Sequence, residues 1–377
     1  MIKKVFCVAV LIFALSHCGK ISMAPVQMPP LKAAKMNHLW VTTTDYQSGL
    51  LVGIDLVQKS LEPLRIPIHS DAVVRAPKGS PYFYVINRLG ADNIEWGDRT
   101  NGKVLGQFSV GRATNPQDIA IINPAQAYVT RFQSNKLLKV NPRTGVRIKE
   151  IDIFEGADSK DISSTDPDGR PEMTWMNLQG SHLLILLQRL NSEKGFEPSN
   201  KSQLAVLNTA SDRIEQIITL KGTNPVTEMK PFSKGFVVGE AGILGQKDGG
   251  IEFFDSNLNS LGWLTDEEKL GGDIVDCLIL DKNRGLAIVA KDTFGVKPTT
   301  QLVLFSLVDG SVMSVVKDSG KYSLQQLLLD EERNIVFVSD RDPKKPGILA
   351  LDSRSLVPLF ASYYQTGLPP YHMVLAE

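Results

Sequence analysis

Short apolar runs separated by polar turns fill the chain from about residue 38 to its end. The clearest unit covers residues 117–151, and its four runs lie at 117–122, 127–132, 136–140 and 146–151. Runs of this length bounded by Asn, Pro and Gly predict β-strands. Four of them in succession predict an antiparallel meander.

The same unit recurs along the chain. First strands are predicted to start near Ala72, Gln117, Glu172, Val226, Ile274, Ser323 and Pro370, at intervals of 45 to 55 residues. Second and third strands also recur seven times each. A four-stranded unit at this spacing predicts a β-propeller, because one sheet buries its faces only by packing against its neighbours.

The two ends of the repeat predict that the ring is closed. The first unit begins at its second strand near Leu39, whereas residues 370–375 form a spare first strand. This strand would complete blade one. The sequence therefore predicts an all-β fold over residues 38–377, a seven-bladed β-propeller with four-stranded antiparallel blades.

The first 37 residues have a different pattern. Residues 1–4 are basic and residues 5–15 are an apolar run, shorter than the roughly 20 residues that span a bilayer. Residues 1–17 are therefore predicted to be a signal peptide. The following Leu15-Ser16-His17-Cys18 resembles a bacterial lipobox, which implies lipid attachment at Cys18, although His17 stands where a small residue is usual. Ordinary signal cleavage near Met23 and Ala24 is the alternative.

Residues 18–37 contain Pro and Met without a clear period and are interpreted as a flexible tether. Of the three cysteines, Cys7 lies in the leader. With Cys18 acylated, only Cys277 remains, in an apolar strand where we expect a small core residue.

One blade resembles a known repeat. Residues 115–120, then Tyr128-Val129-Thr130, then the turn 141–145 (Asn-Pro-Arg-Thr-Gly) are similar to the YVTN-type (YncE-like) β-propeller repeat. Residues 166–173 and 187–190 are similar to envelope lipoproteins of that family. The resemblance implies a propeller in the bacterial cell envelope, with scaffolds, binding proteins and a few enzymes among its members.

Composition narrows the class of partner. Apolar residues make up 42% of the chain, and 41 Lys and Arg balance 41 Asp and Glu. This composition is that of a globular domain, and the balanced charge argues against a nucleic-acid partner. We expect an envelope protein or a small polar ligand as partner, and membrane contact only through a lipid anchor.

Charged residues recur at the predicted strand ends that face the channel mouth. Second strands end in Arg88, Arg131, Arg189, Glu240, Lys291 and Arg341, and first strands start with Asp118, Glu172, Glu228, Asp276, Gln326 and His372. Two concentric rings, basic outside and largely acidic inside, would form a polar binding site. The alternative is that these residues pair to lock neighbouring blades.

The longest connector, residues 156–171, carries Asp158, Asp161, Asp166 and Asp168. Asp166 and Asp168 are the candidate ligands of a divalent cation such as calcium. Asp-Pro-Asp-Gly is also a good plain turn. No phosphate loop, dinucleotide fingerprint, nucleophile elbow or zinc-protease motif occurs in the sequence.

These observations predict a non-enzymatic binding or scaffold lipoprotein of the cell envelope, exported and anchored in the outer membrane on its periplasmic or surface face. A metal-dependent propeller hydrolase of the lactonase kind, with Asp118, Glu172, Glu228 or His372 as ligands or base, is the alternative. A quinone-dependent oxidoreductase is a more distant one.

Overall fold

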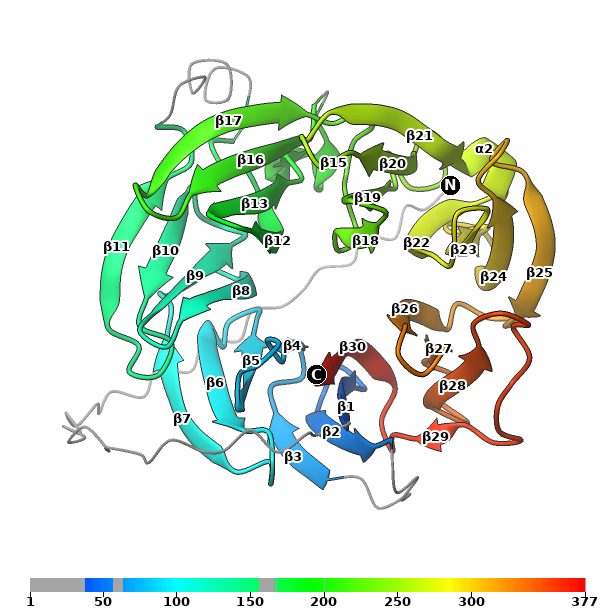
Figure 1. Cartoon of the computed structure of the whole chain (residues 1–377), viewed down its shortest axis with the longest axis horizontal. Coiled ribbons are helices and arrows are strands. Elements are labelled where there is room, and N and C mark those ends of the chain that lie inside the picture. Colours follow the sequence, from blue (N-terminus) through cyan, green and yellow to red (C-terminus); the bar gives the residue numbers. More distant parts are fainter. Residues whose placement is uncertain (1–37, 57–63, 156–165, 167, 200, 377) are drawn as a thin grey trace, which may run out of the picture. The chain divides into compact units, whose positions relative to one another are not determined.

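The computed structural model describes residues 38–56, 64–155, 166, 168–199 and 201–376. The predicted signal peptide, the tether with Cys18, and Asp158 and Asp161 lie outside the described residues. The described strands form seven four-stranded antiparallel sheets arranged in a ring (Figure 1). The predicted seven-bladed β-propeller is confirmed.

Each sheet is one blade, and the strand given first for each blade below is the innermost one. Blade 1 contains β30 (Pro370–Ala376), β1 (His38–Thr44), β2 (Gly49–Asp55) and β3 (Leu64–Ile68). Blade 2 contains β4 (Ala72–Arg75), β5 (Tyr82–Asn87), β6 (Asn93–Asp98) and β7 (Val104–Ser109). Blade 3 contains β8 (Pro116–Asn123), β9 (Gln126–Arg131), β10 (Lys136–Val140) and β11 (Arg147–Asp152).

The remaining blades follow the same order. Blade 4 contains β12 (Met173–Gln179), β13 (His182–Leu187), β16 (Gln203–Asn208) and β17 (Arg213–Thr219). Blade 5 contains β18 (Lys230–Phe232), β19 (Gly235–Glu240), β20 (Gly250–Phe254) and β21 (Ser260–Asp266). Blade 6 contains β22 (Asp273–Ile279), β23 (Arg284–Lys291), β24 (Thr299–Ser306) and β25 (Val312–Asp318). Blade 7 contains β26 (Leu324–Asp330), β27 (Ile335–Asp340), β28 (Gly347–Asp352) and β29 (Tyr364–Gln365).

The C-terminal strand closes the ring as predicted. β30 pairs antiparallel with β1, with Leu39 opposite Leu375 and Val41 opposite Met373. Met373 is fully buried, in the cluster that joins blade 1 to Phe337 and Ile348 of blade 7. The closure therefore depends both on strand pairing and on apolar packing between the first and last blades.

Apolar side chains on both faces of the second and third strands fill the spaces between blades. One cluster joins Tyr128 and Leu137 of blade 3 to Leu183 and Ile185 of blade 4. Cys277 is fully buried in the cluster between blades 5 and 6, as expected for a small core residue. Burial against both neighbours explains why the strands are apolar on two faces.

Three features differ from a regular repeat. The first strand of blade 5 was expected near Val226 but begins at Lys230; Pro225, which has no N–H to donate, forms only an isolated bridge with Glu240. A hairpin, β14 (Leu190–Asn191) and β15 (Glu197–Pro198), flanks the 3₁₀-helix η1 (Ser192–Lys194). The short helix α2 (Glu267–Leu270) precedes blade 6.

Among the described residues, no helix is long and apolar enough to cross a membrane.

Candidate functional site

Four residues of the predicted inner ring occupy equivalent places and accept a backbone hydrogen bond from the next blade. The donor–acceptor pairs are Met176 N to Asp118 (2.8 Å), Leu327 N to Asp276 (2.7 Å), Met373 N to Gln326 (2.5 Å) and Val74 N to His372 Nδ1 (3.4 Å). Register shifts interrupt the inner strands of the donating blades just before Met176 and Leu327, and the N–H groups that these shifts free need acceptors. These four side chains therefore join neighbouring blades, whereas a role for them in ligand binding stays a prediction.

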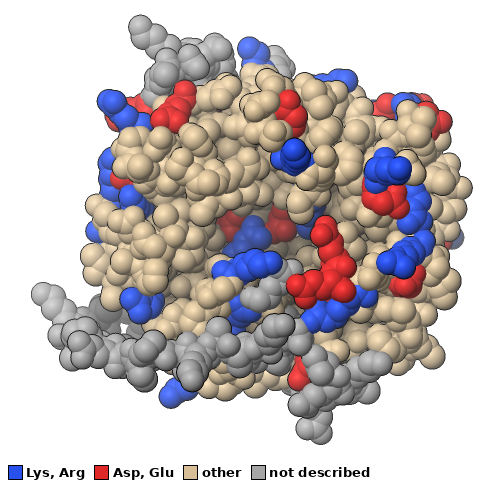
Figure 2. All heavy atoms as spheres, viewed as in Figure 1, with Lys and Arg blue, Asp and Glu red and all other residues tan. Residues whose placement is uncertain are grey.

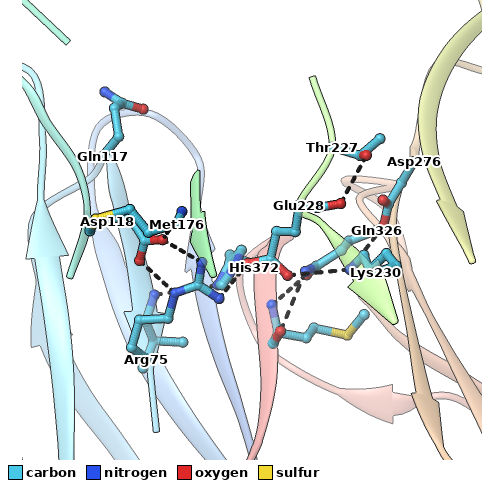
Figure 3. Close-up of polar contacts among 12 residues, drawn as sticks. Arg75, Gln117, Asp118, Met176, Thr227, Glu228, Lys230, Asp276, Gln326 and His372 are labelled. Carbon is cyan, nitrogen blue, oxygen red and sulfur yellow. Dashed lines mark hydrogen bonds and ion pairs between the residues drawn. The ribbon is translucent and has the colours of Figure 1, made fainter. Parts of the chain in front are cut away.

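The other two members of that ring are placed differently. Glu172 precedes β12, is buried, and accepts a hydrogen bond from Leu190 N at 2.8 Å. Burial, together with the nearby carboxylates Asp168 and Asp166, raises the pKa of Glu172 to about 9. Glu228 precedes β18 and points into the channel (Figure 3).

Arg75 at the end of β4 connects the two sides of the channel. Its guanidinium forms a fork with Asp118, with Nε 2.6 Å from Oδ1 and Nη2 2.8 Å from Oδ2. Its third nitrogen, Nη1, lies 2.5 Å from Glu228 Oε1 (Figure 3). Blades 2, 3 and 5 are thus tied together by one cation, and bidentate pairing of this kind is the strongest form of ion pair.

Lys230 provides the second cation. Its ammonium lies 3.3 Å from Glu228 Oε2 and 3.8 Å from Asp276 Oδ2, and it donates to the carbonyl of Leu327 at 3.3 Å. Asp118, Glu228 and Asp276 therefore share two cations, the partly buried Arg75 and the buried Lys230.

His372 contacts Glu228 and is a neutral imidazole. Val74 N donates to Nδ1, which leaves the proton on Nε2, 3.0 Å from Glu228 Oε1. The ring stacks on Trp175 with centroids 5.4 Å apart, and the guanidinium of Arg75 lies 5.1 Å from the centroid of the same indole ring. Both imidazole nitrogens are engaged.

Burial and the contacts within this network shift the pKa values of its ionisable side chains in different directions. Burial alone would raise the pKa of Glu228, but Arg75 and Lys230 outweigh it and hold that pKa well below 4.5. Burial raises the pKa of Asp276 to about 6, although Lys230 opposes it. Burial lowers the pKa of His372, although the hydrogen bond to Glu228 opposes this shift. At neutral pH the cluster therefore holds an ionised Glu228 beside an uncharged imidazole.

The channel leaves little free space above this network. A cavity of about 90 Å³ is lined by residues including Trp175, Glu228, Lys230, Gln325 and Tyr371. Ligand pockets for drug-sized molecules have roughly 300–1,000 Å³. Figure 2 shows the centre of the ring as a hollow with basic and acidic side chains lying together inside it.

Most residues of the predicted outer ring have hydrogen-bond or ion-pair partners, within their own blade or a neighbouring one. Arg88 donates to Asp71 (Nε to Oδ1, 2.9 Å) and to the Tyr371 hydroxyl (2.7 Å). Arg131 pairs with Glu150 at 2.8 Å.

Arg189 is buried, pairs with Asp166 at 3.3 Å, and donates to Gln203 at 2.9 Å. Glu240 is also buried; burial, together with Glu252, raises its pKa well above 4.5.

Lys291 and Arg341 are the exceptions. Neither side chain has a hydrogen bond or ion pair among the described residues, and Arg341 instead lies over the rings of Tyr46 and Tyr371.

The candidate metal ligands form a hydrogen-bonded turn. Asp166 accepts from the N–H groups of Asp168 and Arg170, and Asp168 accepts from Ser192 N at 3.0 Å. Asp166 also pairs with Arg189. No group of three or more His, Cys, Asp or Glu side chains with metal-binding geometry occurs in the part of the chain that the structure describes.

The sequence reasoning missed Arg75 and Lys230, the two cations on which the channel network depends. It considered the starts of first strands and the ends of second strands, whereas Arg75 ends a first strand and Lys230 begins β18 four residues after the start expected at Val226. The available signal was a charged residue on an otherwise apolar first strand, which needs a partner when the ring is closed.

The channel-mouth end of the blades also presents aromatic side chains to solvent. Antiparallel order puts the loops between second and third strands at the same end as the blade connectors. All four exposed aromatic residues of the described chain belong to these segments, and each is between 47% and 78% exposed: Tyr46, Phe196, Phe294 and Tyr322. A groove of about 400 Å³ lies beside Phe294, between the loops of blades 5 and 6, and is also lined by Lys247 and Lys291.

Comparisons with known proteins support the architecture. No protein-family model and no curated protein matches the chain. AztD from Citrobacter koseri superimposes with a TM-score of 0.52 and 10% identity, over 90% of this chain and 99% of AztD. A putative 6-phosphogluconolactonase from Bacteroides fragilis gives 0.57 and 10%, over 93% and 100% of the two chains. The dihydro-heme d1 dehydrogenase NirN in complex with DHE gives 0.54 and 13%, over 92% and 77%. Identities this low establish the β-propeller fold alone.

Proposed function

We propose that this protein is a non-enzymatic binding or scaffold β-propeller of the bacterial cell envelope, which binds its partner at the channel-mouth face. The YVTN-type repeat and the lipobox-like Cys18 support this location, with Cys18 as the lipid anchor. The observation that carries the proposal is the confinement of all four exposed aromatic residues of the described chain to this one end of the blades. Exposed aromatic side chains grouped on one surface are typical of protein interfaces.

The state of the channel groups favours binding over catalysis. A general base needs a free lone pair near the substrate, but both nitrogens of His372 are engaged. Glu228 and Asp118 both pair with Arg75, and Asp276 faces Lys230. The 90 Å³ cavity admits only a small group. A partner therefore has more surface available at the mouth than inside the channel.

The proposal is tested by purifying the tagged protein from solubilised envelopes. The test variant replaces Phe294 and Tyr322 with Ser, and the control replaces Val308, an exposed residue of the opposite loops, with Ser. We expect a partner that is retained by the wild type and by the Val308 variant and is lost from the double variant. Equal retention by all three proteins would contradict the proposed face. Turnover in a lactone and ester screen would instead support the hydrolase alternative.

A further inference from the structure

Arg341 follows β27 at the mouth and holds a positive charge that no described residue neutralises. Its Nη1 is buried and has no hydrogen-bond partner, and its guanidinium forms no ion pair with any described residue. A buried donor without an acceptor costs roughly 1–3 kcal/mol. A buried donor of this kind in a folded protein is usually satisfied by a water, an ion or a ligand.

The acidic residues beside Arg341 already have other partners. Asp340 lies 3.8 Å from the Lys317 ammonium and accepts from the Tyr363 hydroxyl at 3.2 Å. Asp342 pairs with Lys321 at 2.6 Å. The two acidic residues next to Arg341 in the sequence therefore pair with other cations, and the charge of Arg341 has no acidic partner among them.

The local charge balance is positive as well. Residues 317–323, at the end of blade 6 and in the connector to blade 7, and residues 340–346 of blade 7 carry five basic residues against three acidic ones: Lys317, Lys321, Arg341, Lys344 and Lys345 against Asp318, Asp340 and Asp342. A surplus of positive charge at a concave mouth concentrates anions there.

Aromatic rings hold the guanidinium in place. The Cζ atom of Arg341 lies 5.0 Å from the ring centroid of Tyr46 and 5.3 Å from that of Tyr371. Stacked rings restrict the side chain while leaving the planar N–H edge without an acceptor. Tyr371 also lines the channel cavity, so the Arg341 guanidinium lies against a residue of that cavity's wall.

We propose that Arg341 is the anchor of an oxyanion subsite, which takes the carboxylate or phosphate group of the ligand or partner bound at the channel mouth. A guanidinium offers parallel N–H donors that match the two oxygens of either group. The inference rests on the proposed function in that it assumes the mouth to be the binding face, and it specifies the chemistry of what binds there.

The subsite is tested with inorganic phosphate and acetate as probes, against chloride at equal ionic strength. The purified protein from residue 20 onward is compared with Arg341→Gln and with Arg354→Gln, which removes an exposed arginine from the opposite end of the same blade. The melting temperature is measured over a concentration series. Bound anion raises it to a plateau by mass action, whereas general salt effects continue to rise and are equal in all variants.

We expect a saturating rise in the wild type and in Arg354→Gln, and at least a tenfold weaker apparent affinity in Arg341→Gln. Arg341→Lys keeps the charge without the planar fork and should be intermediate. A stronger response to phosphate or to acetate identifies which group the ligand carries. Parallel, unsaturated responses in all proteins, or equal affinities in Arg341→Gln and Arg354→Gln, would overturn the subsite.

These results separate the subsite from the proposed function. Saturating anion binding without any partner purified from envelopes would keep the subsite and remove the scaffold proposal. A partner lost on mutation of Phe294 and Tyr322, but no saturable anion response, would keep the scaffold proposal and remove the subsite.

Discussion

Replacing Glu228 with Gln should destabilise the propeller far more than the same change at an exposed ion pair. Glu228 contacts Arg75 at 2.5 Å, Lys230 at 3.3 Å and His372 at 3.0 Å, so one carboxylate serves both cations and the imidazole. Gln has no charge and one acceptor oxygen. The variant leaves Lys230 with the more distant Asp276 and takes from Arg75 one of its two carboxylate partners.

The magnitude follows from burial. Breaking one partner of a buried ion pair costs about 3–5 kcal/mol, and an exposed pair contributes about 0–1 kcal/mol. The side chains of Glu228 and Arg75 are 17% and 20% exposed, and the oxygen of Gln keeps one contact, so we expect a loss of about 2–3 kcal/mol.

The chain contains a matched control for this variant. Glu215 lies 3.1 Å from His182, almost the distance between Glu228 and His372, but both side chains of that pair are exposed. Glu215→Gln should therefore change the free energy of unfolding by less than about 1 kcal/mol. The comparison separates the effect of a His–Glu contact from that of the buried network.

The effect should also depend on pH. The folded-state pKa of Glu228 is below 4.5, so its stabilising contribution is complete above pH 4.5 and is lost as the pH falls through the folded value. The gap between wild type and Glu228→Gln should be full near pH 7 and should narrow below pH 4.5. Guanidinium unfolding curves at several pH values measure it. A gap below about 1 kcal/mol at pH 7, or one that grows in acid, would refute the account of the network.

Four further results are expected. Removal of residues 370–377 should lower the melting temperature strongly, because β1 loses its partner strand and the blade 1–blade 7 cluster loses Met373; an unchanged melt would contradict ring closure. Burial raises the pKa of Asp276, so ionising this carboxyl destabilises the fold of the wild type. The stability of Asp276→Asn relative to the wild type should therefore increase as the pH rises from about 4 to 7, by up to about 3 kcal/mol. A difference in unfolding free energy that does not change with pH would exclude this. Cys18→Ser should release the protein from membranes, and unchanged membrane partition would rule out the lipid anchor. Calcium should not shift the melt of the soluble domain relative to EDTA if Asp166 and Asp168 form only a turn; a shift abolished by mutating both would establish a metal site there.

The fold could be predicted because its determinants are local. Strands, turns and their period lie within single units of about 50 residues, and the missing first strand before Leu39 directly indicated closure by residues 370–375. The exception, blade 5, is also local in origin. Pro225, which has no N–H to donate, forms only an isolated bridge, and β18 begins at Lys230, which the hydrophobic pattern alone did not reveal.

The site could be predicted only in part, because pairing across the channel is not local. The sequence placed Asp118, Asp276, Gln326 and His372 at equivalent inner positions, but the backbone N–H groups that they accept from belong to neighbouring blades. The partnership of Arg75 with Glu228 joins residues 153 positions apart, and no spacing in the sequence encodes it.

The most direct test of the channel-mouth face is site-specific photo-crosslinking in intact envelopes. A photo-reactive amino acid replaces Phe294 at the mouth in one variant and Val308 at the opposite end in the other. The account predicts a discrete crosslinked product from position 294 and none from position 308. Products from position 308 alone, or from neither position, would contradict it.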